Sequence, residues 1–251
     1  MKSLLLMKSE NKGIRLNRYL ALCGVASRRG SEQYILDGRV KINGNVVTNI
    51  ATIVNESDIV EIDGKRINKL ENIYLVLNKP VNTVCSRKDL ANRRTIYDIV
   101  DINIPNIFSV GRLDYKSSGL LILTNDGEFA NSLIHPSNNI IKEYTVKVDF
   151  KNKKDFKDTL KRMSDNFIKG IRIDNIFYKA YDIKIVDYNT IKVYLIEGKK
   201  REIRIVFNYF NIDINSLCRT KIGNMELKSL LLKEGEYKIF SKEKILKLIY
   251  G

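Results

Sequence analysis

The stretch GRLDYKSSGLLILTND, residues 111–126, joins a charged tripeptide to an apolar run. Arg112 and Asp114 flank a leucine, a small polar turn follows, and four apolar residues run from Leu120 to Leu123. A short apolar run after a turn is typical of a strand in a sheet core. We therefore predict that Asp114 lies in a loop feeding a buried strand, where catalytic groups are usually placed.

Further strands and helices are expected on both sides of this stretch. Residues 73–80, IYLVLNKP, form a buried strand that stops at the proline. The patterns predict strands at residues 143–148, 181–187 and 190–198 and helices at residues 126–134, 154–167 and 200–210. This mixture indicates an α+β fold with a mainly antiparallel mixed sheet, and we assign it to one domain over residues 72–251.

The charge of the chain favours an anionic partner. Of its 251 residues, 44 are Lys or Arg and 29 are Asp or Glu, which gives a net charge of +15. Nucleic acid is the commonest partner of such a surface, although charge alone does not decide the function.

Several classes of protein are disfavoured by what the sequence contains. Three dispersed cysteines form no CxxC pair, and the single His135 gives no HExxH pattern, so neither a disulfide framework nor a metal site is expected. The first residues hold only a four-residue apolar run, and no run approaches the ~20 residues that span a bilayer. We expect a cytoplasmic protein in which His135 is structural or faces RNA.

A small module is expected at residues 13–68. Apolar residues at helical spacing predict a helix that Gly24 ends, and Ser27 can cap a second helix. The dipeptide Asn43-Gly44 then predicts a hairpin between alternating strands. Residues 13–41 hold six basic and two acidic residues, whereas residues 42–64 hold four acidic residues and no basic one. Such polarity would present the helices to phosphates.

This module resembles an S4 RNA-binding domain. The resemblance rests on RLNRYLALCGVASRRGSEQYILDGRVKINGNVV and on the later DIVEIDG. A departure is Gly30, which costs roughly 1 kcal/mol against alanine inside the second helix. The residues that the resemblance turns toward RNA are Arg15, Arg18, Ser27, Arg28, Arg29, Arg39 and Lys41.

Four blocks along the chain resemble the RsuA/RluB family of ribosomal pseudouridine synthases, which also carry an S4 domain. They are LNKP, GRLDYKSSGLLILTNDG, HPSNNIIKEYTVKV and EGKKREIRIVF with LCRTKIGNMEL, in the order and approximate spacing of the family. The resemblance implies a monomeric isomerase that converts a uridine of ribosomal RNA to pseudouridine without cofactor or metal. The GVASRR form of the first module is more similar to the large-subunit branch, which acts on 23S rRNA.

The resemblance also implies roles for three residues. Asp114 would either attack C1′ of the uridine or remove a ribose proton, and the sequence leaves both routes open. Arg204 would pair with Asp114 and keep it ionised, and Tyr144 would stack on the extruded uracil. Contacts with RNA are implied for Arg112, Lys142 and Arg201.

Two departures from the family pattern keep alternatives open. The family block NRQIRRMF reads KREIRIVF here, with Lys200, Glu202 and Ile205 at altered positions, and Asn82 replaces a usual glycine. Asparagine tolerates a left-handed backbone, so we expect the turn at Asn82 to survive. The altered KREIRIVF block leaves open a non-catalytic S4-type protein that binds rRNA or assists ribosome assembly. Because target choice depends on RNA shape, an enzyme acting on 16S rRNA is a further alternative.

Overall fold

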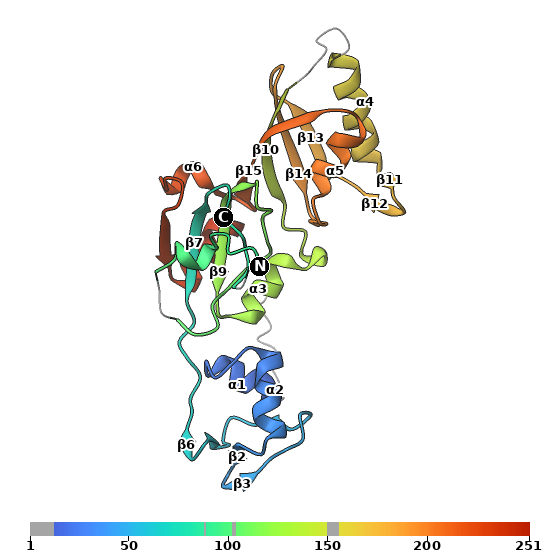
Figure 1. Ribbon diagram of the computed structural model, residues 1–251. Helices are drawn as coiled ribbons and strands as arrows, with labels where there is room; N and C mark the ends of the chain where they lie inside the picture. The colour runs from blue at the N-terminus through green and yellow to red at the C-terminus, as the bar shows by residue number, and fades with distance from the viewer. Residues whose placement is uncertain (1–12, 88, 102–103, 150–155) are drawn as a thin grey trace, which may run out of the picture. The chain divides into compact units, whose positions relative to one another are not determined.

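The computed structural model describes residues 13–87, 89–101, 104–149 and 156–251, and it divides the chain into two compact units (Figure 1). The first unit comprises the described residues up to Asn72 together with residues 104–107. The second comprises the described residues from Ile73 to Asp101 and from Phe108 to Gly251. The expected second domain thus gives a short segment to the first unit, where the Asn106 side chain donates to the carbonyls of Ala21 and Ala26 at 2.9 and 2.7 Å. Within the described ranges, no helix is long and apolar enough to cross a membrane.

The first unit packs two helices against a small sheet. Its core holds the fully buried residues Leu16, Leu20, Ile35 and Val40. The four-stranded sheet has the order β3-β2-β5-β6, and β1 pairs separately with β4. The elements are β1 (Ile14–Arg15), α1 (Leu16–Leu22), α2 (Arg28–Leu36), β2 (Val40–Ile42), β3 (Asn45–Val46), β4 (Ile53–Val54), β5 (Val60–Ile62) and β6 (Lys65–Arg66).

Local signals fix both helices of this unit. Gly24 follows α1 with φ of +80°, a left-handed conformation that suits glycine. The Ser27 hydroxyl accepts a hydrogen bond from the backbone of Gly30 at 3.1 Å, which confirms the predicted cap. Gly30 therefore lies in the first turn of α2, where its N–H has a partner.

The second unit is built on one large sheet of order β13-β14-β10-β15-β9-β7-β17. Every pairing along this order is antiparallel except the parallel contact of β9 with β15. The predicted α+β class and mainly antiparallel mixed sheet are therefore confirmed. The strands are β7 (Tyr74–Lys79), β8 (Phe108–Ser109), β9 (Ser118–Thr124), β10 (Lys142–Asp149), β13 (Asp182–Ile185), β14 (Thr190–Leu195), β15 (Asp213–Ile222), β16 (Met225–Glu226) and β17 (Tyr237–Phe240), with a separate hairpin of β11 (Ile171–Ile173) and β12 (Ile176–Tyr178).

The strand predicted after Asp114 forms the centre of the core. Residues Leu120 to Leu123 of β9 are fully buried, and β9 lies between β7 and the parallel neighbour β15. Helices α3 (Gly127–Ile134) and α7 (Lys242–Tyr250) supply buried residues to this core. Asp126 caps α3 through bonds from Glu128 and Phe129, both at 3.0 Å.

The other half of the sheet is accompanied by α4 (Phe156–Lys169) and α5 (Glu202–Tyr209), which lie beside β13 and β14 in Figure 1. Phe167 and Phe207 are fully buried on these two helices. The helix predicted over residues 154–167 is present from Phe156, while its first two residues lie outside the described part of the chain. The short elements η1 (Ile96–Asp98), η2 (Pro136–Asn138) and α6 (Leu227–Leu230) complete the unit.

Candidate active site

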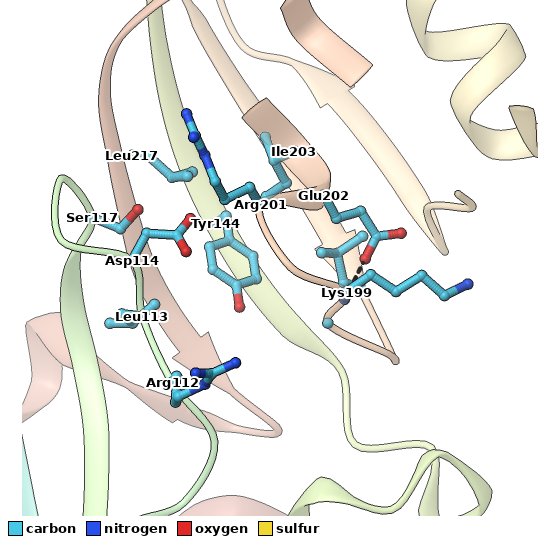
Figure 2. Close-up of a pocket in the computed structure, with 12 residues that line it drawn as sticks. Arg112, Leu113, Asp114, Ser117, Tyr144, Lys199, Arg201, Glu202, Ile203 and Leu217 are labelled. Carbon is cyan, nitrogen blue, oxygen red and sulfur yellow. Dashed lines mark hydrogen bonds between the residues drawn. The ribbon is translucent and has the colours of Figure 1, made fainter. Parts of the chain in front are cut away.

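A pocket opens where the Asp114 loop meets β10, β15 and the start of α5 (Figure 2). Asp114 and Tyr144 both line it, although they are 30 residues apart in the sequence. The complete lining is Arg112, Leu113, Asp114, Ser117, Tyr144, Leu195, Gly198, Lys199, Arg201, Glu202, Ile203 and Leu217. The pocket thus joins the carboxylates of Asp114 and Glu202, one aromatic ring and several cations, a set that suits a base and its phosphates.

Backbone hydrogen bonds fix the loop that carries Asp114. The Ser117 N–H donates to the Asp114 carbonyl at 3.0 Å and closes a turn. The N–H of Asn82, whose φ is +55°, donates to the Tyr115 carbonyl at 2.7 Å. The turn expected at Asn82 is therefore formed in a left-handed conformation, and it supports the loop directly.

Lys79 anchors the same loop from beneath. Its side chain is fully buried, and its Nζ donates to the carbonyls of Ser117 at 2.7 Å, Pro80 at 2.8 Å and Asp114 at 3.3 Å. Burial lowers the pKa of Lys79 to about 8, while the carboxylates of Asp114 and Glu234 oppose that shift. The sequence analysis gave Lys79 no role, although a lysine at the end of an apolar strand was a signal that it must find partners inside.

Tyr144 reaches the pocket from β10. Its side chain is 9% exposed, and the register against β15 shifts between Glu143 and Tyr144. The Tyr144 hydroxyl accepts a long bond of 3.5 Å from Nη1 of Arg219. The Tyr144 ring is thus nearly buried and borders the pocket.

Arg219 is a buried cation behind the pocket that the sequence analysis missed. It is 5% exposed, and its Nε donates to the Leu120 carbonyl at 2.7 Å. Together with the bond to Tyr144, this contact ties β9 and β10 to the strand between them. Its Nη2 is buried and has no hydrogen-bond partner among the described residues.

Arg204 requires a correction to the expected geometry. The predicted ion pair with Asp114 is not formed within 4.0 Å, and Arg204 is not among the residues that line the pocket. Its Nη2 donates instead to the Lys116 carbonyl at 2.8 Å and to the Ser117 hydroxyl at 3.4 Å. Burial lowers the pKa of the Arg204 guanidinium, and the charge of Asp114 opposes this effect. Arg204 therefore supports the turn after Asp114.

Arg201, rather than Arg204, is the arginine at the start of α5 that lines the pocket. It precedes α5 with φ of +55°, and its side chain lines the cavity with Asp114 (Figure 2). Its neighbour Glu202 is 4% exposed and accepts from the backbone of Lys199 at 2.9 Å and of Lys179 at 3.4 Å. Burial raises the pKa of Glu202. Because carboxylate oxygens accept these bonds as an amide oxygen would, the departure from the family glutamine preserves the loop.

Of the other expected RNA contacts in this unit, Arg112 lines the pocket and Lys142 does not. The Lys142 ammonium donates to the Ile196 carbonyl at 2.8 Å. Burial lowers its pKa to about 8, and the nearby charge of Arg219 adds to the shift. Lys142 therefore positions the strand end. His135 caps η2, with Nδ1 2.7 Å from the Ser137 hydroxyl.

The cations expected to face RNA in the first unit lie mostly on its surface. Arg18 is half-buried, and Arg39 forms an ion pair with Asp63 and lies 4.3 Å above the Tyr34 ring. The exposed residues among those expected to face RNA are Arg15, Ser27, Arg28, Arg29, Arg39 and Lys41. In the described part of the chain, His, Cys, Asp and Glu form no group of three or more that could hold a metal ion.

The S4-like module and the α+β unit with its aspartate-lined pocket define a class of RNA-modifying enzymes. A model of the RNA pseudouridylate synthase family matches residues 73–209, and a model of the S4 domain matches residues 14–60. The chain belongs to the RNA pseudouridylate synthase family. It is an isomerase with an N-terminal S4 RNA-binding domain.

Relatives support this assignment over nearly the whole chain. An uncharacterized RNA pseudouridine synthase of Rickettsia typhi is 35% identical over 240 residues, covering 94% of this chain and 95% of the relative. The ribosomal large subunit pseudouridine synthase B of Bacillus subtilis is 35% identical over 223 residues, covering 86% and 88%. A crystal structure of a pseudouridylate synthase superposes with a TM-score of 0.64 at 26% identity, covering 94% of this chain and all of the other.

Proposed function

We propose that this pseudouridine synthase isomerises a specific uridine of 23S ribosomal RNA, with Asp114 as the reacting carboxylate. The observation that carries the proposal is the convergence of Asp114 and Tyr144 on one pocket that Arg112 and Arg201 also line. The choice of the large subunit is supported by the printed name of the Bacillus subtilis relative and by the GVASRR form of the S4 domain.

The proposed reaction breaks the C1′–N1 bond of the uridine and rejoins the turned uracil through C5. Asp114 either forms a transient bond to C1′ or removes a ribose proton. After the new bond forms, the C5 proton leaves to water and N1 ends with a proton. No atoms are gained or lost, so no redox partner is required. Tyr144 holds the extruded base by stacking, which is worth ~1 to 3 kcal/mol per base.

The cations around the pocket are proposed to hold the RNA backbone. Arg112 and Arg201 stand on opposite elements, the Asp114 loop and the start of α5, so they can contact phosphates on either side of one nucleotide. Arg204 and Lys79 are proposed to keep the Asp114 loop in place. Because rRNA is the substrate, we place the enzyme in the cytoplasm, where it acts as a monomer.

The test is tritium release from transcripts labelled at C5 of uridine. The wild type is expected to release tritium from large-subunit RNA, and Asp114→Asn should release none while its affinity for the RNA stays within a few-fold. Reverse-transcription stops after carbodiimide treatment then map the uridine. Release from the small-subunit transcript alone would overturn the 23S assignment, and turnover by Asp114→Asn would overturn the role of Asp114.

A further inference from the structure

One leucine in the second unit is wholly exposed at the tip of a loop. Leu90 has a relative exposure of 105%, whereas the next most exposed of the large apolar residues among those described, Leu231, has 81%. Leu90 follows Asp89 in the connection between Cys85 and Arg94. The whole side chain of Leu90 is therefore available to a partner outside the chain.

The turn that presents Leu90 is held by an internal clamp. The Arg93 guanidinium donates to both oxygens of Asp89, at 2.6 and 3.0 Å, and the Arg93 N–H donates to the same carboxylate at 3.0 Å. The Asn92 N–H donates to the Asp89 carbonyl at 3.1 Å. The Asp89 side chain is only 9% exposed, and Arg93 holds its pKa well below the usual range. Leu90 is therefore displayed by a fixed turn.

The base of the loop is paired to itself. The Val84 N–H donates to the Arg94 carbonyl at 2.9 Å, and the Ile96 N–H donates to the Val84 carbonyl at 3.0 Å. The two ends of the loop are thus brought together in the same unit that carries the pocket. We call the described residues between them, 85–87 and 89–94, the arm.

The arm is attached to the segment that carries Asp114. The Arg93 guanidinium lies 5.1 Å from the centre of the Tyr115 ring, and Tyr115 directly follows Asp114. At the other end, the Cys85 thiol donates to the Leu113 carbonyl at 3.4 Å. Both sides of the arm therefore contact the residues next to the reacting carboxylate.

The charge of the arm fits RNA. Its described residues include Arg87, Arg93 and Arg94 against the single acid Asp89, and Arg87 and Arg94 are exposed. A basic arm with an apolar tip is the composition that proteins use to hold phosphates while an apolar side chain enters the base stack. An apolar groove on another protein would accommodate the leucine, but the net positive charge of the described arm favours RNA phosphates over such a groove.

We propose that Leu90 is a wedge that enters the stack of helical RNA beside the target uridine and stabilises its extrusion toward the Asp114 pocket. This inference rests on the proposed function and deepens it. Extruding a stacked base costs a few kcal/mol, and an apolar side chain in the vacated space offsets part of that cost. The clamp within the arm means that little ordering is required when RNA binds.

The first test measures single-turnover tritium release from C5-labelled 23S transcript at saturating enzyme. Leu90→Ser should slow release about tenfold or more, which corresponds to about 1.4 kcal/mol of lost stabilisation of extrusion. Its Kd for the transcript should change by less than about threefold, because the phosphate contacts remain. Leu90→Met should restore the rate, and Leu231→Ser, the matched control, should leave it unchanged. Weakened binding with an unchanged rate, or no effect at all, would overturn the wedge.

A second readout does not need turnover. In the complex of Asp114→Asn with the 23S transcript, the base opposite the extruded uridine should lose its pair and gain reactivity, toward dimethyl sulfate for adenine or cytosine and toward carbodiimide for guanine or uracil. Adding Leu90→Ser should remove this reactivity while the complex persists. Equal reactivity in both complexes would overturn the wedge, whether or not the protein isomerises the uridine. Absence of tritium release from the wild type with this difference retained would instead overturn the proposed function alone.

Discussion

Lys79 is the residue whose ionisation links the stability of the fold to the Asp114 loop. Its ordinary pKa of 10.5 applies to the unfolded chain, and burial lowers it to about 8 in the folded protein. Below pH 8 both states carry the proton, so the folded state bears the full cost of burying the charge. Between pH 8 and 10.5 the folded state loses the proton first, and stability therefore rises with pH in that range.

We predict that Lys79→Met removes this rise. The free energy of unfolding of the wild type relative to the variant should increase from pH 7 to pH 10, as measured by urea denaturation at each pH. At pH 7 the variant should also lose about 1 to 3 kcal/mol, because the carbonyls of Asp114 and Ser117 lose a buried donor. A stability difference between wild type and variant that stays constant with pH would contradict the lowered pKa of Lys79. The titration of Lys142 contributes equally to both proteins and so cancels in this difference.

At the scale of the elements, the parallel contact of β9 with β15 depends on Gly119. Its φ is +104°, and a Cβ there would lie 2.3 Å from the Arg219 carbonyl oxygen and 2.8 Å from the Cys218 sulfur. Gly111 also has a positive φ, of +72°, but a Cβ there would meet nothing within 4 Å. A side chain at Gly111 would therefore strain only the backbone, whereas a side chain at Gly119 would also clash with β15.

We predict that Gly119→Ala lowers the free energy of unfolding by about 2 to 5 kcal/mol, because left-handed strain and a forced separation of two strands add together. Gly111→Ala should cost only the strain, about 1 to 2 kcal/mol. Chemical denaturation of both variants measures the difference. Equal losses of unfolding free energy in the two variants would mean that β9 and β15 accommodate the added methyl group at Gly119 without measurable cost.

The sequence predicted the elements better than the contacts between them. The strand at Leu120–Leu123, the cap at Ser27 and the mixed sheet follow from local patterns, which neighbouring residues determine. The partners of Arg204 and the burial of Arg219 were not predictable in this way. They depend on pairings between residues about a hundred positions apart, and only the folded sheet brings those positions together.

At the scale of the whole molecule, the uneven charge of the first unit is expected to determine how binding responds to salt. Arg28 and Arg29 are exposed at the start of α2. Changing both to Gln should weaken binding to 23S rRNA and lower the log-log salt slope by roughly 0.7 to 0.9 for each phosphate that the protein no longer neutralises. The control in which both become Lys keeps the charge and should keep the slope. Titrations of RNA at several salt concentrations give the values, and an unchanged slope in the Gln variant would place the docking surface elsewhere.

The parallel pairing of β9 with β15 also has a consequence for how the protein is made. Ser118 pairs with Cys218, and at the sheet edge Tyr74 of β7 pairs with Phe240 of β17. Strands β7 and β9 can therefore pair fully only after β15 and β17 have been synthesised. Contacts this distant in sequence slow folding, and domains emerge from the ribosome N-terminus first. We expect the S4 domain to fold during synthesis while the pocket forms only when translation is almost complete. A nascent chain could then hold RNA before it could modify it.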